Sequence, residues 1–126
     1  MEVFDTDVLI DIQHRHPPAV AWFNSLQIIP DVPGFVVMEL IQSARNKKEL
    51  QDSQQFVAML TTVWPSVADC ELACRNFSTY HLSHTLGLID SLIADTAIGF
   101  SAKLLTFNTK HFSVVPGLSI AEPYIR

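Results

Sequence analysis

Met1-Glu-Val-Phe-Asp-Thr-Asp-Val-Leu-Ile-Asp11 is the stretch around which the rest of the chain is organised. The β-forming residues at its start predict a short apolar strand that ends at Asp5. Asp5, Thr6 and Asp7 then mark a strand-to-helix turn, in which Thr6 or Asp7 can cap the following helix. Ligand sites in open parallel sheets lie at the carboxyl ends of strands, so Asp5 marks either such a site or a simple helix cap.

The composition limits what the chain can be. Its 126 residues predict one domain, 1–126, and 48% apolar residues are enough for a hydrophobic core. No apolar run is long enough to span a membrane and no secretory leader is visible, so we expect a cytoplasmic protein. The net charge of −5 argues against broad attraction to nucleic acid. A nucleic-acid substrate remains compatible with it, because metal ions neutralise acidic pockets.

Strands alternate with helices after this first stretch. Further strands are predicted at 28–32, 63–64, 103–106 and 118–121. Helices are predicted at 8–12, 19–26, 35–44, 49–62, 67–80 and 88–100, with a loop at 81–87 and a turn at 108–112. The alternation favours an α/β fold, a three-layer sandwich with a mainly parallel five-stranded sheet flanked by helices.

Four acids stand in apolar surroundings, namely Asp5, Glu39, Asp90 and Asp95. Such acids must be paired, solvated or bound to metal, and the chain has too few nearby cations to pair them all. The first three lie near strand ends or helix starts, which share one edge of a parallel sheet. Carboxylates that meet there repel one another unless a divalent cation lies between them. Oxygen ligands favour Mg²⁺ or Mn²⁺ over zinc, and such ions activate water for attack on a phosphodiester.

Four segments together resemble the motifs of PIN-domain ribonucleases in their usual order. They are Val-Phe-Asp-Thr-Asp-Val-Leu-Ile-Asp (3–11), Val-Val-Met-Glu-Leu-Ile-Gln-Ser-Ala (36–44), Ile-Asp-Ser-Leu-Ile-Ala-Asp-Thr-Ala-Ile (89–98) and Leu-Leu-Thr-Phe-Asn-Thr-Lys-His-Phe (104–112). Each motif alone is weak, but four in order across nearly the whole chain are specific.

The resemblance implies roles for individual residues. Asp5, Glu39 and Asp90 take the places of the catalytic acids that bind Mg²⁺ or Mn²⁺. Asn108 stands where many members have a fourth acid. Hydroxyl positions that orient water or phosphate in the family are occupied here by Thr6 and Thr106.

The nearest resemblance is to VapC-type toxins of bacterial toxin–antitoxin pairs. It implies a ribonuclease that cleaves tRNA or ribosomal RNA, forms a homodimer and is held inactive by a small antitoxin protein. Apolar side chains on the 35–44 and 49–62 helices are in surplus and predict that these helices form the dimer contact; they are Phe35, Met38, Ile41, Phe56 and Met59.

Three further acids need separate interpretations. Asp95 lies five residues after Asp90, about 140° further around an α-helix, so both cannot point at one ion. We expect Asp95 to lie behind the metal ligands or on the surface. Asp7 is close enough to the site to hold a water beside the metal, whereas Asp11 is expected to be solvated or paired.

The only basic cluster is Arg45, Lys47 and Lys48. It is either a solvated helix end, where cations suit the helix dipole, or a contact for an RNA backbone. The turn residue His111 is expected to be structural.

Cysteines and histidines offer a zinc interpretation through Cys70, Cys74, His81 and His84, but their spacing matches no common zinc pattern. We expect the cysteines to be buried thiols of one helix rather than a disulfide, and the histidines to lie in a loop.

Two other functions compete with the nuclease. A haloacid-dehalogenase-type phosphatase would use Asp5 as nucleophile, but Val8 and Leu9 stand where that class expects glycine and threonine. A non-catalytic PIN-fold module that binds RNA or protein is the other alternative, and the intact acids argue against it.

Overall fold

The computed structural model describes residues 1–126 as an α/β domain with two small parallel sheets. Strands β1 (Glu2–Phe4), β4 (Lys103–Leu105) and β5 (Ser119–Ala121) form one sheet in the order β1-β4-β5. Strands β2 (Val32–Pro33) and β3 (Thr62–Val63) form the other. The helices are α1 (Thr6–Gln13), α2 (Pro17–Ser25), α3 (Gly34–Gln42), α4 (Lys47–Ala58), α5 (Val67–His84), α6 (Leu88–Gly99) and α7 (Thr109–Phe112).

The expected five-stranded sheet is wrong, because the strands divide into sheets of three and two. A single parallel bridge between Val3 and Asp31 joins the two sheets. The backbone N–H of Phe4 donates to the Asp31 carbonyl over 3.0 Å, and the Asp31 N–H donates to Glu2 over 3.1 Å. Pro30 has no N–H to donate, so the ladder does not extend backwards from this bridge.

The predicted strand at 28–32 is also wrong for most of its length. Ile28 is 84% exposed and the regular strand begins only at Val32. Strand β3 lies one residue earlier than predicted, at Thr62–Val63. The 28–32 segment has the composition of a strand, but most of it has no neighbouring strand with which to form hydrogen bonds.

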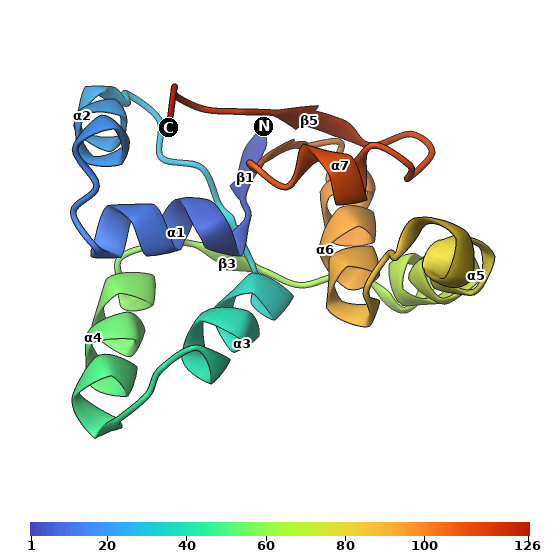
Figure 1. Ribbon diagram of the computed structural model, residues 1–126, viewed down its shortest axis with the longest axis horizontal. Coiled ribbons are helices and arrows are strands. Elements are labelled where there is room, and N and C mark those ends of the chain that lie inside the picture. The colour runs from blue at the N-terminus through green and yellow to red at the C-terminus, as the bar shows by residue number, and fades with distance from the viewer.

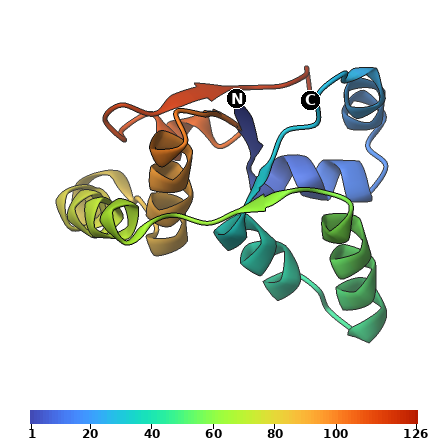
Figure 2. The ribbon, with the colours of Figure 1, turned by 180° about the vertical axis from the view of Figure 1, so that it is seen from behind.

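Helices surround the strands in the three-dimensional arrangement. In Figure 1, α1, α2 and α4 lie to the left of β1, and α5 and α6 lie to the right. Figure 2 shows from behind that β3 crosses the back of the molecule, with α3 and α4 below it. Helix α3 packs against both α1 and α6, so it connects the two groups of helices.

The core is apolar, and α6 contributes to its centre as predicted. Ile93 and Ala97 are fully buried there, and Leu92 is half-buried. The fully buried side chains of β1, Val3 and Phe4, belong to the same cluster. Burial of this kind stabilises the fold by about 25 cal/mol per Å² of apolar surface. It fixes β1 beside α6, which places the residues that follow β1 near the start of α6.

Two helix boundaries differ from the prediction. Helix α4 runs over Lys47–Ala58 rather than 49–62, because the Asn46 side chain caps it by accepting from the Glu49 N–H. Helix α5 continues to His84, so the loop predicted at 81–87 is wrong for its first half. Thr85, in the left-handed conformation with φ of 54°, ends α5.

The expected burial of both cysteines is wrong. Both thiols are free, but Cys70 is half-buried and Cys74 is exposed. Helix α5 turns Ala73 towards α6, which leaves Cys74 on the solvent side. His81 and His84 also lie on this helix rather than in a loop.

One glycine is required by close packing where α3 begins. A Cβ atom on Gly34 would overlap the ring of Trp64, which follows β3. This approach seats the start of α3 directly on the β2–β3 pair. No helix of the structure has the length and apolar character to cross a membrane.

Candidate metal and phosphodiester site

A pocket of about 380 Å³ lies at the carboxyl ends of the parallel strands. It collects side chains from the turn after β1, from α1, from the middle of α3, from the start of α6 and from the turn after β4. The lining residues are Asp5, Thr6, Asp7, Ile10, Glu39, Gln42, Ser43, Asp90 and Asn108. The predicted acids Asp5, Glu39 and Asp90 therefore share one pocket.

Asp5 is the most buried of these acids, with 6% of its surface exposed. It is the N-cap of α1, one of the two roles that the sequence left open for it, whereas the predicted caps Thr6 and Asp7 lie inside the helix. One carboxylate oxygen accepts from the Thr6 N–H over 2.8 Å, and the other accepts from the Thr106 hydroxyl over 2.7 Å. The cap and the pocket acid are thus the same residue. Thr106 follows β4, so this hydrogen bond joins two neighbouring strand ends.

Glu39 faces Asp5 from the middle of α3. Its Oε1 accepts a hydrogen bond from the Thr6 hydroxyl over 2.5 Å. Thr6 donates through its backbone to Asp5 and through its side chain to Glu39, so it spaces the two carboxylates. The two predicted hydroxyl residues both orient acids in this structure.

Asp7 is fixed by backbone donors. Its Oδ1 accepts from the Val8 N–H over 2.8 Å, and its Oδ2 accepts from the Phe107 N–H over 2.9 Å. Because Phe107 follows the Thr106 that binds Asp5, one turn after β4 holds both acids. Asp7 is therefore a rigid wall of the pocket.

Asp90, on the first turn of α6, and Asn108 also line the pocket. His111 lies beside them, with Nδ1 3.1 Å from the Asn108 amide nitrogen and 3.9 Å from Asp90 Oδ2. The expectation that His111 is only structural therefore misses its place at the edge of the pocket. Its spacing of three residues from Asn108, across one turn of α7, is the signal that sequence reasoning overlooked.

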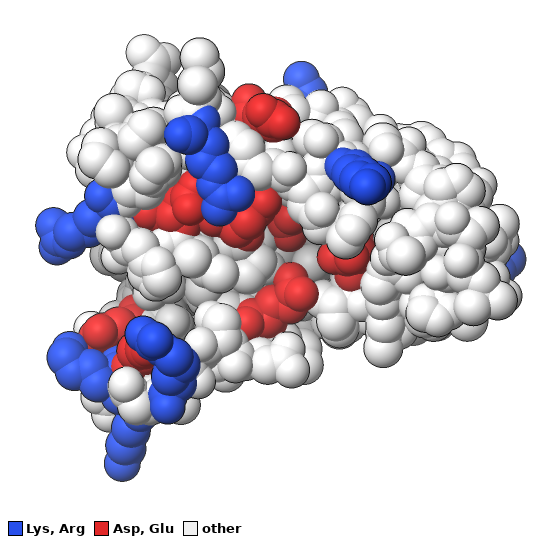
Figure 3. All heavy atoms as spheres, viewed as in Figure 1, with Lys and Arg blue, Asp and Glu red and all other residues white.

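The electrostatic setting favours a bound cation. Burial, and then the charge of Asp7, raise the pKa of Asp5 to about 7, although hydrogen bonds from Thr106 and Thr6 oppose the shift. Burial also raises the pKa of Glu39, with the charges of Asp90 and Asp7 adding to it. Figure 3 shows acidic side chains gathered in a hollow at the centre of this face. A divalent cation would relieve both the burial and the repulsion.

The donor set suits a hard cation such as Mg²⁺ or Mn²⁺, since the lining acids and Asn108 offer oxygen atoms. No three acidic, histidine or cysteine side chains lie close enough to contact one ion together. This spacing is compatible with Mg²⁺, which keeps several waters and binds through one or two carboxylates together with substrate phosphates. One or two of Asp5, Glu39 and Asp90 would contact the ion directly, and the remaining acid would hold one of its waters.

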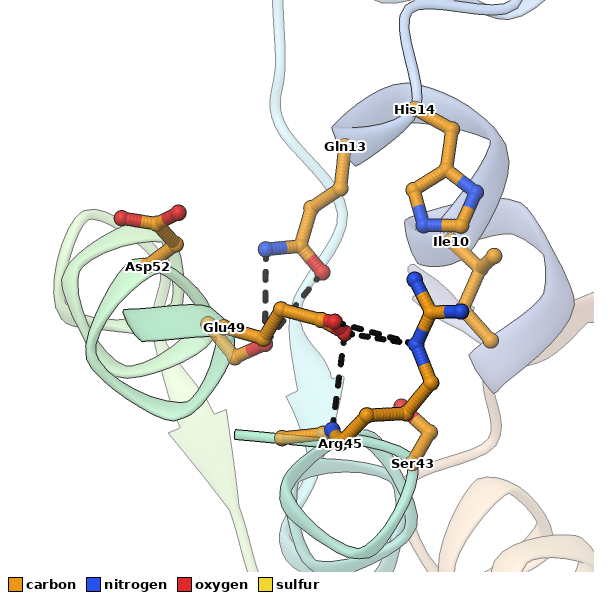
Figure 4. A pocket seen from close by; sticks show the side chains of 9 residues that line it. Ile10, Gln13, His14, Ser43, Arg45, Glu49 and Asp52 are labelled. Carbon is orange, nitrogen blue, oxygen red and sulfur yellow. Dashed lines mark hydrogen bonds and ion pairs between the residues drawn. The ribbon is translucent and has the colours of Figure 1, made fainter. Parts of the chain in front are cut away.

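A second groove, of about 330 Å³, continues from this pocket and shares Ile10 and Ser43 with it. Figure 4 shows Gln13 and His14 of α1 on one side and Arg45 with Glu49 on the other. The Nε of Arg45 donates to Glu49 over 3.0 Å.

The basic cluster is therefore partly neutralised within α4 and the turn before it. Arg45 pairs with Glu49, and Lys48 pairs with Asp52 over 3.2 Å. Both pairs are exposed, and Arg45 alone of the predicted RNA-binding residues lines the groove.

Asp95 lies neither on the surface nor in the pocket. It is 1% exposed on α6, where the Asn76 amide of α5 donates to its two oxygens over 3.2 and 3.5 Å. The surface prediction for Asp95 is therefore wrong. Burial raises its pKa, and the hydrogen bonds from Asn76 oppose that shift.

Asp11 is paired, as one of its two interpretations predicted. Tyr124 donates to Asp11 Oδ2 over 2.8 Å, and Arg126 donates to both oxygens over 3.1 Å. Burial alone would raise the pKa of Asp11, but these hydrogen bonds and the charge of Arg126 lower it below its usual value. Sequence reasoning did not identify Tyr124 or Arg126, because more than a hundred residues separate each from Asp11.

An α/β domain with acids at the ends of parallel strands is a common setting for metal-assisted phosphodiester chemistry. The model of the PIN domain family matches residues 3–118 of the sequence. The chain therefore belongs to the PIN-domain family, as the four motifs predicted. Membership of this family argues against the haloacid-dehalogenase-type phosphatase.

Similar proteins and structures come from bacterial toxin–antitoxin systems. A protein of Rickettsia bellii named Ribonuclease VapC is 28% identical over 125 residues, which is 94% of this chain and 92% of the relative. VapBC2 of Rickettsia felis, bound to a promoter DNA fragment, has a TM-score of 0.76, 22% identity and coverage of 95% and 96%. DNA-bound VapBC of Salmonella typhimurium has a TM-score of 0.78, 20% identity and coverage of 96% and 98%. These two structures support the fold alone.

Proposed function

We propose that the protein is a ribonuclease that depends on Mg²⁺ or Mn²⁺ and hydrolyses phosphodiester bonds in RNA. The observation that carries the proposal is the pocket shared by Asp5, Glu39 and Asp90, in which Asp5 and Glu39 have no basic partner. The similarity to a protein named Ribonuclease VapC supports RNA as the substrate. A divalent ion held there would polarise the phosphoryl group and lower the pKa of an attacking water.

The chain's own residues prepare this chemistry. Thr106 and Thr6 hold the Asp5 carboxylate in place, and Thr6 also orients Glu39, so both acids are positioned before substrate binds. Asp7 is held by two backbone donors and offers remaining lone pairs to a water in the pocket. Asn108 supplies an uncharged oxygen where a fourth acid would add repulsion.

The open pocket suits a single-stranded part of a folded RNA such as tRNA or ribosomal RNA. The substrate strand would continue past Ser43 into the groove lined by Arg45. Lys47 and Lys48 lie in the following turn of α4 and would add attraction to the backbone outside the groove.

In the cell, the protein would act as the toxin of a toxin–antitoxin pair. A toxin–antitoxin complex of Klebsiella pneumoniae is among the similar structures, which supports a small antitoxin as partner. A homodimer is also proposed, because Met38, Ile41 and Met59 are exposed on or beside α3 and α4. Phe35 and Phe56, by contrast, pack partly against the core and contribute less to such a contact.

The test is cleavage of total RNA by purified protein with and without EDTA, for the wild type and Asp90→Asn. Asp90→Asn keeps the size of the side chain and removes one charge from the pocket. EDTA and the substitution should each abolish cleavage, and Glu39→Gln should act alike. Cleavage that survives both equally would contradict the proposal. RNA binding without metal-dependent cleavage would favour the non-catalytic PIN-fold alternative.

A further inference from the structure

Arg126 is the basic side chain whose charge reaches the acidic pocket. It belongs to the segment after β5, which Figure 1 shows running back towards α2, near α1. Its guanidinium pairs with Asp11 on α1, one helical turn after the pocket acid Asp7. One turn is about 5.4 Å, comparable to the length of one nucleotide. Arg126 thus lies beside the pocket rather than within it.

Packing holds the guanidinium in a fixed orientation. Nε and Nη2 donate to the two oxygens of Asp11, each over 3.1 Å. The guanidinium also lies over the Phe107 ring, 5.0 Å from its centre. Tyr124 packs against the same Phe107 ring, with 4.8 Å between the two ring centres. Two hydrogen bonds and a ring restrict the side chain far more than an ordinary surface ion pair.

Part of the guanidinium nevertheless remains free. Of its five N–H donors, those on Nη1 have no partner in the structure. The side chain is 49% exposed, so these donors face solvent. Figure 3 shows basic side chains along the edge of the central acidic hollow. A rigid, partly free guanidinium beside an acidic pocket suits an anion that the pocket alone would repel.

We infer that Arg126 is a positioning residue that binds a backbone phosphate of the RNA strand next to the bond being cleaved. The inference rests on the proposed function. The Phe107 ring holds the guanidinium so that Nη1 is presented to the strand, while the Asp11 carboxylate competes with a phosphate for its charge. Phe107 also donates through its backbone to Asp7, so the phosphate contact and the pocket wall share one support.

A structural role for the Arg126–Asp11 pair alone makes a different prediction. If the pair only fastens the segment after β5 to α1, removing either partner should weaken the protein and its RNA binding alike. If Arg126 binds phosphate, removing Arg126 should weaken binding. Asp11→Asn should not, because it keeps the Phe107 contact and one oxygen that accepts from Arg126, and it removes a competing negative charge. Arg126→Gln and Asp11→Asn are therefore a matched pair of variants that break the same ion pair with opposite changes in charge.

The experiment measures binding of a fluorescent 20-nucleotide single-stranded RNA of mixed sequence across a range of salt concentrations. Ca²⁺ replaces Mg²⁺ so that binding is measured without cleavage. Arg126→Gln should weaken binding about tenfold and lower the slope of log affinity against log salt by about 0.7, the share of one phosphate. Asp11→Asn should bind as tightly as wild type or more tightly, with an unchanged slope.

Equal losses in both variants, or an unchanged slope in Arg126→Gln, would overturn the inference. If Arg126→Gln does not fold, as judged by circular dichroism, Asp11→Asn decides alone: weaker binding contradicts the phosphate contact. Wild-type cleavage of RNA, measured separately, tests the proposed function. If the wild type neither binds nor cleaves RNA, the proposed function is wrong. If the wild type cleaves RNA but Arg126→Gln binds it normally, only the role of Arg126 is wrong.

Discussion

The two ends of α1 carry acids in opposite electrostatic settings. At its start, Asp5 and Asp7 are buried among other acids, and burial raises the pKa of both. Near its end, Asp11 accepts from Tyr124 and Arg126, and its pKa is lowered. Arg126 pairs with Asp11, whereas no basic side chain contacts Asp5 or Asp7. The difference supports the proposal that a cation from outside binds at the start of α1.

The largest effect is expected from Asp5→Asn, which removes a charge from the unpaired end of α1. Cleavage should fall about a thousandfold, because the loss of a metal ligand removes several kcal/mol of transition-state stabilisation. The free energy of unfolding, measured without metal, should by contrast increase in Asp5→Asn. The raised pKa means that folded wild type loses stability as pH rises from 3.8 to about 7, a loss that asparagine does not have.

Urea denaturation in EDTA at pH 5 and pH 8 measures this second effect. Asp5→Asn should unfold with about 1–3 kcal/mol more free energy than wild type at pH 8, and the gain should be smaller at pH 5. Asparagine still accepts from Thr106 or Thr6, so the cap is not lost. A variant that is less stable than wild type at pH 8 would contradict the electrostatic comparison.

Asp11→Asn tests the paired end of α1 and should have the opposite sign. The variant loses the charge that Arg126 and Tyr124 stabilise, at a cost of about 1–2 kcal/mol at pH 7. The expected cost is limited because the Arg126 side chain is half-exposed. Because the pKa of Asp11 is lowered in the folded protein, its ionised carboxylate stabilises the fold above pH 3.8. This stabilisation is lost as the pH falls through the pKa of the folded protein. The difference in stability between the wild type and the variant should therefore shrink as pH falls below 3.8, measured by urea denaturation.

The smallest effect is expected from Asp95→Asn, at the contact of α5 and α6. Asp95 is buried like Asp5, but its partner is the neutral amide of Asn76. Because its pKa is raised, ionisation lowers stability as pH increases above 3.8, and the variant avoids that loss. We expect a gain of less than about 1 kcal/mol at pH 8 and none near pH 3, measured by urea denaturation. RNA cleavage at matched temperature serves as the control, since Asp95 does not line the pocket.

The acids of the pocket were predictable because each lies in a local motif. Asp5 follows an apolar strand, Glu39 interrupts an apolar helix, and Asp90 lies in the first turn of another apolar helix. Local patterns of this kind survive folding, since the strand or helix carries the residue to the sheet edge. The fourth element, Thr106, is fixed by the strand before it.

The failures of prediction lie where the deciding partner is distant. The 28–32 segment has strand-forming residues, but only Asp31 and Val32 reach a neighbouring strand. Asp11 and Arg126 come together across 115 residues, and nothing in either local sequence indicates it. The side of α5 that faces α6 likewise determines the exposure of Cys74, which its helical spacing alone did not reveal.

The hydrogen bond between Thr106 and Asp5 also sets when the pocket can exist during synthesis. It spans 101 residues, and β1 pairs with no strand of its own sheet until β4 is made. Asp5, Glu39 and Asp90 all precede β4, so a nascent chain can contain every pocket acid while the pocket is still unformed. Translation therefore delivers the acids early and their arrangement late. The pocket therefore cannot take its final form until the strand that supports Thr106 has left the ribosome.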